Sequence, residues 1–372
     1  MPSTRTSAQE TAIAAVDLRK TYPGGRGRPP VPALDGLSFA VPAGTVFALL
    51  GPNGAGKSTT ARILTTLSRA DAGTAHVAGI DVARDPERVR RTIGYVAQKP
   101  VTDPLDTGRE NLVLAGRLQG LGARTARTRA AELLDRFALA DAADRLVRTY
   151  SGGMARKLDV VMGIVHSPRV LFLDEPTTGL DPEARAGMWA EIERMTAVES
   201  MTVLLTTHYL DEADRLAANV AIVDRGRVVV AGTPDALKDE LRGDGIVVEL
   251  AAPAPAPAAG SAGPPGELVP DAGPALADRV TDAVRACSGV REVHLRGRTL
   301  RARAESGAAA LPAVLAALDA AGVPVASATL ARPSLDDVYL RRTGRTFAAA
   351  QSDAPGSSAG DDTEATAAGV AA

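Results

Sequence analysis

The segment GPNGAGKST, from Gly51 to Thr59, has the residue types and spacing of a phosphate-binding loop. A short apolar run precedes it and helix-forming residues follow it, which predicts a strand, a loop and a helix in that order. The glycines would let backbone N–H groups face a β-phosphate, Lys57 would reach the β- and γ-phosphate oxygens, and Ser58 would coordinate Mg²⁺. The sequence therefore predicts a nucleoside triphosphate site formed by Gly51, Pro52, Asn53, Gly54, Ala55, Gly56, Lys57, Ser58 and Thr59.

An acidic pair follows a second predicted strand, the apolar run from Val170 to Leu173. Asp174 at the strand end can bind Mg²⁺, and the adjacent Glu175 can orient and deprotonate an attacking water. Taken alone, the pair could also be a surface turn after a strand. The phosphate loop upstream favours the catalytic interpretation, so we expect Asp174 to bind the metal and Glu175 to act as the general base.

Two further polar residues follow apolar runs. Gln98 comes just after IGYVA, and His208 comes just after VLLTT. From a strand end, either side chain could contact the γ-phosphate, the magnesium ion or the attacking water. Each residue type is more often structural when it stands alone. With the phosphate loop present, we expect both to be catalytic and Gln98 also to be a metal ligand.

The segment YSGGMARK, from Tyr150 to Lys157, resembles a second anion site. Ser151 can cap the helix predicted after it, and Gly152 and Gly153 allow a phosphate to approach closely. Apolar residues recur at helical spacing behind the glycines, which predicts that Arg156 and Lys157 lie on the solvent side of this helix. A single nucleotide does not need two phosphate-binding segments. YSGGMARK therefore raises the question of which molecule's phosphate it binds.

The elements that must position these residues alternate between apolar strands and helices, which predicts an α/β core with a parallel sheet. In such a sheet, ligands gather at the carboxyl ends of the strands, where Gly51, Asp174 and His208 would lie. Residues 11–50 predict a β-rich opening of short strands and turns, and residues from about 107 to 165 predict a helical insertion that begins with a capping box at Thr107 and Glu110. After a Pro-rich linker, the order of elements is βαββαβ, a ferredoxin-like pattern.

Composition narrows the class of protein. The 372 residues carry a formal net charge of −2, so no general attraction to nucleic acid follows. The single cysteine, Cys287, excludes an intrachain disulfide and any zinc site with several cysteines. The first residues lack the pattern of a signal peptide, and no apolar run is long enough to span a membrane.

Taken in order, these segments resemble the ATP-binding subunit of ABC transporters. The resemblance rests on Tyr22, the phosphate loop, Gln98, YSGGM, VLFLDEP, GLD at Gly179–Asp181 and His208, and it covers residues 11–240. TYSGGM and the later LARPSLDDVYLRRTGR are similar to the daunorubicin-resistance branch. The resemblance implies a P-loop NTPase cassette with a parallel core sheet, an antiparallel β subdomain and a helical insertion, followed by a small α+β ferredoxin-like accessory domain.

The resemblance also implies roles that the residues alone do not give. Tyr22 would stack on adenine, the loop with Gln98 would link ATP to a membrane partner, and Asp181 would contact a second subunit. In a twofold dimer, Ser151, Gly152 and Gly153 would close the ATP site of the other chain. The family commonly has leucine before the serine and glutamine after the glycines, where this chain has Tyr150 and Met154.

The implied function is ATP hydrolysis, with Mg²⁺, by a homodimer that drives efflux of drugs or other hydrophobic compounds through a separate permease with several membrane spans. The site of action would be the cytoplasmic face of a bacterial membrane. Alternatives are export of a lipid or a natural product made by the cell, and a DNA-maintenance or translation ATPase. The near-neutral charge argues against nucleic acid. We expect a flexible N-terminus at 1–10, the cassette at 11–240, the accessory domain at 246–345 with its linker at 251–274, and a disordered tail at 346–372.

Overall fold

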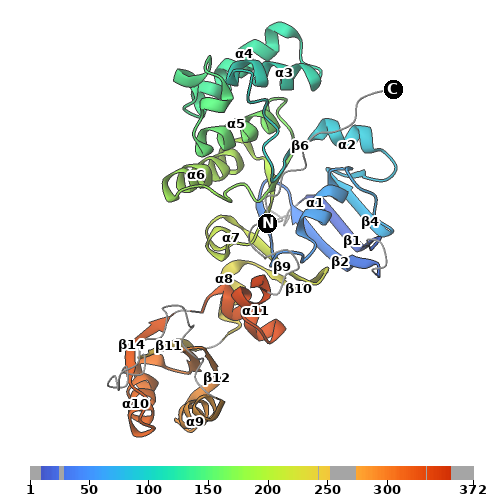
Figure 1. The fold of residues 1–372 in the computed structure, drawn as a ribbon. Coiled ribbons are helices and arrows are strands. Elements are labelled where there is room, and N and C mark those ends of the chain that lie inside the picture. The colour runs from blue at the N-terminus through green and yellow to red at the C-terminus, as the bar shows by residue number, and fades with distance from the viewer. Residues whose placement is uncertain (1–9, 25–28, 242, 252–273, 332, 353–372) are drawn as a thin grey trace, which may run out of the picture. The chain divides into compact units, whose positions relative to one another are not determined.

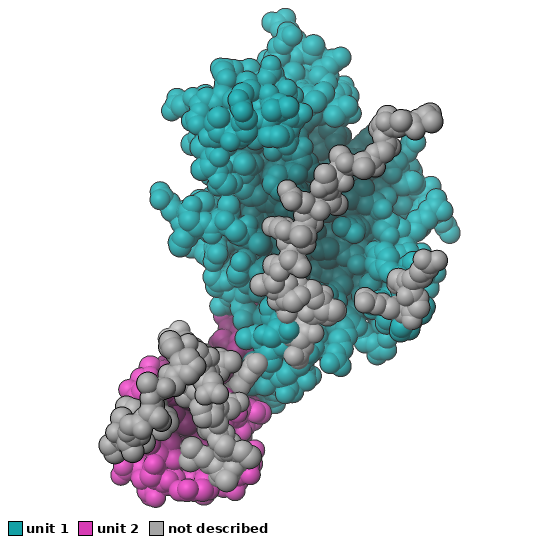
Figure 2. All heavy atoms as spheres, in the orientation of Figure 1, with its two compact units in different colours: residues 1–234, 339–372 teal, residues 235–338 magenta. Residues whose placement is uncertain are grey.

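The computed structural model describes residues 10–24, 29–241, 243–251, 274–331 and 333–352 (Figure 1). The chain divides into two compact units, which Figure 2 colours separately. The first comprises residues 1–234 and 339–372, and the second comprises residues 235–338. None of the helices in the described ranges is both long and apolar enough to cross a bilayer.

The first unit is built on a six-stranded sheet with the order β10-β9-β3-β8-β7-β6. All neighbouring strands are parallel except β10, which is antiparallel to β9. The central strands β3, β7 and β8 are buried along their whole length, because helices or a second sheet cover both faces. The predicted α/β core is confirmed. The strands are β3 Val46–Leu50, β6 Ile93–Val96, β7 Val170–Asp174, β8 Thr202–Thr207, β9 Asn219–Asp224 and β10 Arg227–Gly232.

Alternate residues of the central strands face two separate cores. Phe172 and Leu204 pack with helix α1 and with the antiparallel sheet β2-β1-β4-β5, whereas Leu171 and Leu205 pack with helices of the insertion and with α6. The predicted antiparallel β-rich opening is therefore present as a layer on one face of the central sheet. The elements of this layer are β1 Thr11–Tyr22, β2 Val31–Pro42, β4 Ala72–Val77, β5 Ile80–Asp81, α1 Lys57–Leu64 and α2 Pro86–Thr92.

Helices α3, α4 and α5 form the predicted helical insertion (Figure 1). Helix α3 begins with the predicted capping box: Thr107 accepts from the backbone of Glu110, and the Glu110 carboxylate accepts from the backbone of Thr107. Helix α6 follows strand β7 along the chain, and helix α7 follows strand β8. The bounds of these helices and of the insertion are α3 Gly108–Leu118, α4 Ala123–Arg136, η1 Ala140–Ala142, η2 Val147–Thr149, α5 Gly152–Ile164, α6 Pro182–Glu199 and α7 Leu210–Leu216.

The second unit contains the predicted βαββαβ order. Its antiparallel sheet has the strand order β12-β13-β11-β14, and helices α9 and α10 bury Val280, Val284, Val314 and Leu318 against it. The linker expected at 251–274 lies almost entirely outside the described residues. The elements from residue 234 onward are α8 Pro234–Asp239, β11 Asp244–Leu250, α9 Pro274–Arg285, β12 Val290–Arg296, β13 Thr299–Ala304, α10 Gly307–Ala320, β14 Val325–Ala331 and α11 Leu335–Thr343.

The predicted disordered tail is wrong for its first residues. Helix α12, Phe347–Ser352, packs into the first unit. The Phe347 ring is buried edge-on against Tyr339, with ring centroids 5.1 Å apart, and Arg345 Nη2 lies 2.9 Å from Asp224 Oδ1. One buried aromatic ring and one ion pair thus fix the position of a segment that consists mostly of small and polar residues. Residues 353–372 and the N-terminal residues 1–9 lie outside the described ranges.

Candidate nucleotide site

The phosphate loop begins where β3 ends, and its glycines are needed for space. A Cβ at Gly51 would lie 2.4 Å from the Val223 carbonyl oxygen, and one at Gly56 would lie 2.6 Å from that of Ala33. Gly56 also has φ of 107°, in the left-handed region, immediately before helix α1 starts at Lys57. The loop therefore has the predicted strand, loop and helix arrangement. Its backbone N–H groups lie at a helix N-terminus, where anions bind favourably.

The Lys57 ammonium is buried and is held above the loop. Nζ donates to the carbonyl oxygens of Gly51 at 2.7 Å and of Pro52 at 3.1 Å, and it lies 3.6 Å from Glu175 Oε1. Burial lowers the pKa of Lys57, and the nearby Glu175 carboxylate opposes that shift. The loop thus places a cation directly beside the acidic pair at the end of β7.

Two of the three predicted magnesium ligands, Ser58 and Asp174, lie side by side. Ser58 Oγ donates to Asp174 Oδ1 at 3.1 Å, and the Thr206 hydroxyl donates to the same oxygen. A hydroxyl and a carboxylate are hard oxygen donors of the kind Mg²⁺ prefers. Thr206 was not anticipated from the sequence. The available signal was the pair of threonines that ends the otherwise apolar TVLLTT.

Glu175 lies among three predicted catalytic residues. Its carboxylate accepts from Gln98 Nε2 at 3.0 Å, and it lies 3.2 Å from His208 Nδ1 in addition to the Lys57 contact. Burial raises its pKa, but the contacts with His208 and Lys57 outweigh burial and leave the pKa below its usual value. Glu175 also has φ of 49°, and its N–H donates to the Thr206 carbonyl at 3.1 Å. The group is thus a carboxylate near neutral pH, in a fixed position. Gln98 makes its contact with Glu175 through Nε2, and its additional role as a metal ligand stays a prediction.

The second anion segment has the predicted helix cap. Ser151 Oγ accepts from Met154 N at 3.2 Å at the start of α5. Ser151 and Gly152 are exposed, and a Cβ at Gly152 would meet nothing within 4 Å. Within the described ranges, no hydrogen bond joins residues 151–153 to the phosphate loop at 51–59. The N-terminus of α5 is therefore exposed in the single chain.

The prediction that Arg156 faces solvent is wrong. Arg156 is only 6% exposed, and its guanidinium donates to backbone carbonyls at the ends of β6 and β7. Backbone carbonyls beyond the end of a strand have no partner in the sheet and need other hydrogen-bond donors. Helix α5 places the Arg156 side chain directly beside them. Lys157, the next residue, is half-buried.

Tyr22 and Asp181 are placed by local structure. Tyr22 is the last residue of β1 and is half-buried, with Lys20 Nζ 5.6 Å from the centre of its ring. Asp181 is exposed and caps α6 by accepting from Ala184 N at 2.8 Å. Their roles in adenine stacking and in contacting a second subunit stay predictions.

A contact with the phosphate loop comes from the C-terminal helix. Gln351 Oε1, in α12, accepts from the Asn53 backbone N–H at 3.0 Å. A segment that the sequence indicates to be disordered thus reaches the loop. No pattern in the sequence points to this contact.

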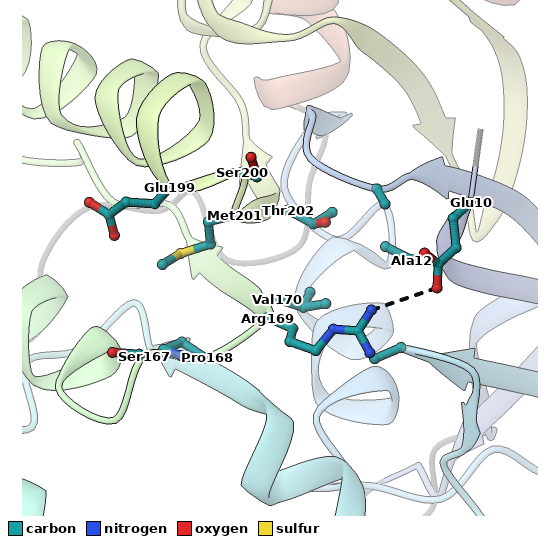
Figure 3. Close-up of a pocket in the computed structure, with 12 residues that line it drawn as sticks. Glu10, Ala12, Ser167, Pro168, Arg169, Val170, Glu199, Ser200, Met201 and Thr202 are labelled. Atoms are coloured by element: carbon teal, nitrogen blue, oxygen red, sulfur yellow. Dashed lines mark ion pairs between the residues drawn. The ribbon is translucent and has the colours of Figure 1, made fainter. Parts of the chain in front are cut away.

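A cavity of about 270 Å³ lies at the opposite edge of the central sheet (Figure 3). Its walls include Val170 and Thr202, the first residues of β7 and β8, and an exposed ion pair of Glu10 with Arg169 at 3.6 Å. Because it lies at the amino ends of the strands, this cavity is not part of the nucleotide site.

Comparisons with known proteins agree with this geometry. The profile of the ABC transporter family matches residues 34–178. The chain is 46% identical over 334 residues to the daunorubicin resistance ATP-binding protein DrrA2 of Streptomyces coeruleorubidus, covering 90% of this chain and 95% of that protein. It is 37% identical over 337 residues to the Nod factor export ATP-binding protein I of Paraburkholderia xenovorans (strain LB400), covering 90% and 98%. An ATP-binding cassette solved as a dimer in a post-hydrolysis state with ADP and Pi shares its fold, with a TM-score of 0.55 and 23% identity over 59% of this chain and 98% of that chain.

Proposed function

Because the chain belongs to the ABC transporter family, as one of its ATP-binding subunits, we propose that two copies bind and hydrolyse ATP between them and drive export of drugs or other hydrophobic compounds through a separate permease. The observation that carries the ATPase function is the position of Glu175, a buried carboxylate 3.6 Å from the Lys57 ammonium. Both groups lie at the strand ends where the phosphate loop begins.

The residues divide the reaction between them. Lys57 and the loop N–H groups bind the phosphate oxygens, and Glu175 orients the attacking water and accepts its proton as the oxygen bonds to the γ-phosphorus. The bond from that phosphorus to the oxygen of ADP breaks in the same process. His208, 3.2 Å from Glu175, can hold the water or a γ-phosphate oxygen. Mg²⁺ bound by Ser58 and Asp174 would neutralise the charge that develops on the phosphates.

The dimer follows from the exposed segment at Ser151–Gly153. A capped helix start with open space around Gly152 is suited to a phosphate, yet it makes no hydrogen bond to this chain's own loop. A twofold dimer would place it over the γ-phosphate held by the other copy. Each ATP would then be closed by both chains, with Asp181 of the neighbouring loop at the same interface and Tyr22 at the adenine end.

The permease would bind an apolar groove beside the Gln98 loop. A cavity of about 300 Å³ there is lined by residues that include Val101, Leu114 and Leu118. These side chains are 60%, 52% and 79% exposed, an unusual grouping of large apolar surface. A short amphipathic helix of a membrane protein would cover them. The chain would then work at the cytoplasmic face of the bacterial membrane, attached through this partner.

The transported compound is inferred from the relatives. The strong match to a daunorubicin resistance protein favours a drug or a similar hydrophobic compound. The match to a Nod factor export protein keeps export of an endogenous natural product or lipid as a second candidate. ATP-dependent uptake into inverted vesicles that contain the chain and its permease separates the two candidates. Uptake of daunorubicin supports the first, and uptake confined to the cell's own lipid extract supports the second.

The ATPase is tested with two variants. Glu175→Gln should keep ATP binding and lose hydrolysis by about 10²- to 10⁴-fold. Ser151→Ala should keep ATP binding by the monomer and lose turnover, since Ser151 serves the other chain's nucleotide. Glu132→Gln, on the exposed side of α4, makes the same chemical change away from the site and should behave as wild type. Near-normal turnover by Glu175→Gln would reassign the base, and near-normal turnover by Ser151→Ala would refute the shared site.

A further inference from the structure

Arg156 has an unusual environment for a charged residue near the start of a helix. It lies five positions after Ser151 in the sequence, but its side chain runs inward beneath the ends of two strands. A guanidinium has five N–H donors in a fixed plane, and here they reach four carbonyl oxygens. The contacts are Nε to Pro176 O at 2.9 Å, Nη1 to Ala97 O at 2.7 Å, Nη2 to Asp174 O at 3.1 Å and Nη2 to Glu175 O at 3.3 Å.

A second buried residue of α5 extends this connection. Asp159 is 2% exposed, and its Oδ2 lies 3.7 Å from Arg156 Nη1. Its other oxygen, Oδ1, accepts from Val101 N at 3.1 Å. Val101 lines the apolar groove. The Arg156–Asp159 pair therefore connects that groove to the ends of strands β6 and β7, next to Gln98 and Glu175.

We propose that Arg156 is a positioning residue that links the segment binding one ATP to the residues that hydrolyse the other. The inference rests on the proposed shared-site dimer, in which Ser151 of a chain serves its neighbour while Glu175 and Gln98 serve its own nucleotide. When Ser151 engages the neighbour's phosphate, any tilt of α5 moves Arg156. Arg156 is hydrogen-bonded to the main-chain carbonyls of Glu175 and of Ala97, the residue before Gln98, so its movement displaces both. The two ATP sites of the dimer are therefore coupled.

Stability alone does not account for this arrangement. A buried ion pair contributes little net stability compared with well-packed apolar side chains, because both charges lose their hydration. A planar fork that holds carbonyls from two different strands does, however, fix their relative position, which a lysine or an apolar residue cannot do. The arrangement suits a residue whose role is geometry.

Arg156→Lys tests this role because it keeps the charge and removes the fork. We expect its affinity for a non-hydrolysable ATP analogue to be unchanged and its kcat to fall by about 10²-fold, as a displacement near 1 Å can cause. The Hill coefficient for ATP should fall toward one. Lys157→Gln, at the next position on the same helix, should change none of these values. Unchanged kcat and Hill coefficient in Arg156→Lys would overturn the inference.

Mixed dimers show whether the link crosses between sites. If one chain carries Ser151→Ala, only the site formed by that chain's Glu175 and the other chain's Ser151 stays active. Adding Arg156→Lys to the other chain should slow this site, although that chain's Glu175 is not part of it. An unchanged rate would overturn the coupling. If Ser151→Ala dimers hydrolyse ATP normally, the shared-site function itself fails, which is a different outcome.

A second variant guards against misfolding. Asp159→Asn keeps the size of the side chain and an oxygen for Val101, but it removes the charge that faces the guanidinium. With a melting temperature near that of wild type, it should show a smaller fall in kcat and in the Hill coefficient in the same direction. Wild-type values for both would contradict the proposal, even if Arg156→Lys does not fold.

Discussion

Thr206 offers a direct test of how the metal ligands are positioned. Its buried hydroxyl donates to Asp174 Oδ1 and accepts from Glu175 N at 3.2 Å. Thr206→Val removes the hydroxyl and leaves no cavity, because valine is nearly the same size. Glu175 N loses its contact with the hydroxyl but keeps its bond to the Thr206 carbonyl at 3.1 Å, so the main loss is the bond with Asp174.

The size of the effect follows from that single bond. A hydrogen bond to a charged group contributes about 1.5–3 kcal/mol. At about 2–4 °C per kcal/mol for a unit of this size, the melting temperature should fall by about 3–12 °C. Asp174 also loses a group that orients it toward Ser58. Loss of such a supporting partner should weaken Mg²⁺ binding by about 10- to 100-fold.

The assay is thermal unfolding together with ATPase activity titrated with Mg²⁺. Thr202→Val is the matched control, since Thr202 lies buried in the same strand and its hydroxyl accepts from Gly44 N at 2.9 Å. The control should lose stability without changing the Mg²⁺ requirement. If Thr206→Val and Thr202→Val need the same Mg²⁺ concentration, Thr206 does not orient a metal ligand.

Two further predictions concern groups outside the phosphate loop. Burial raises the pKa of Glu212, whose carboxylate accepts from Thr177, so its contribution to stability is present at low pH and lost as pH rises through the raised pKa. Glu212→Gln should therefore gain melting temperature relative to wild type between about pH 5 and about pH 8, and a relative loss over that interval would contradict the reasoning. Gln351→Ala frees the Asn53 N–H for a phosphate oxygen and should tighten ATP binding by about 2- to 10-fold, equivalent to one net hydrogen bond. Ser352→Ala on the same helix serves as its control in equilibrium binding, and weaker binding by Gln351→Ala would show that the contact supports the loop instead.

The parts of the site that could be predicted are those set by local sequence and by the direction of parallel strands. Gly51, Asp174 and His208 each follow an apolar run, and parallel strands bring their carboxyl ends to one edge. The glycine spacing can also be recognised from the local sequence, although the close contacts that require it are with Val223 and Ala33, which are distant in the sequence. No long-range information was needed for either.

The residues that were missed depend on partners far away in the sequence. Apolar periodicity assigns Arg156 to the solvent side, because it detects only which side chains are apolar. It does not detect the carbonyl oxygens of Ala97 and Pro176, which need hydrogen-bond donors. In the same way, the composition of the tail conceals that Gln351 accepts a hydrogen bond from the backbone of Asn53. Long-range polar contacts of this kind leave no periodic signal.

The contacts of Glu175 set the order of events in the proposed reaction. Its carboxylate is bound by Lys57, Gln98 and His208, the same groups that the phosphates and the attacking water require. In the proposed mechanism, ATP would draw these side chains away before Glu175 accepts a proton from water. Because Arg156 hydrogen-bonds the main chain of Glu175, this exchange moves side chains while the backbone stays where Arg156 holds it. When the proposed dimer closes and this chain's own Ser151 meets the other chain's phosphate, α5 would move Arg156 and the main chain of Glu175 with it, so hydrolysis would follow nucleotide binding and dimer closure in that sequence.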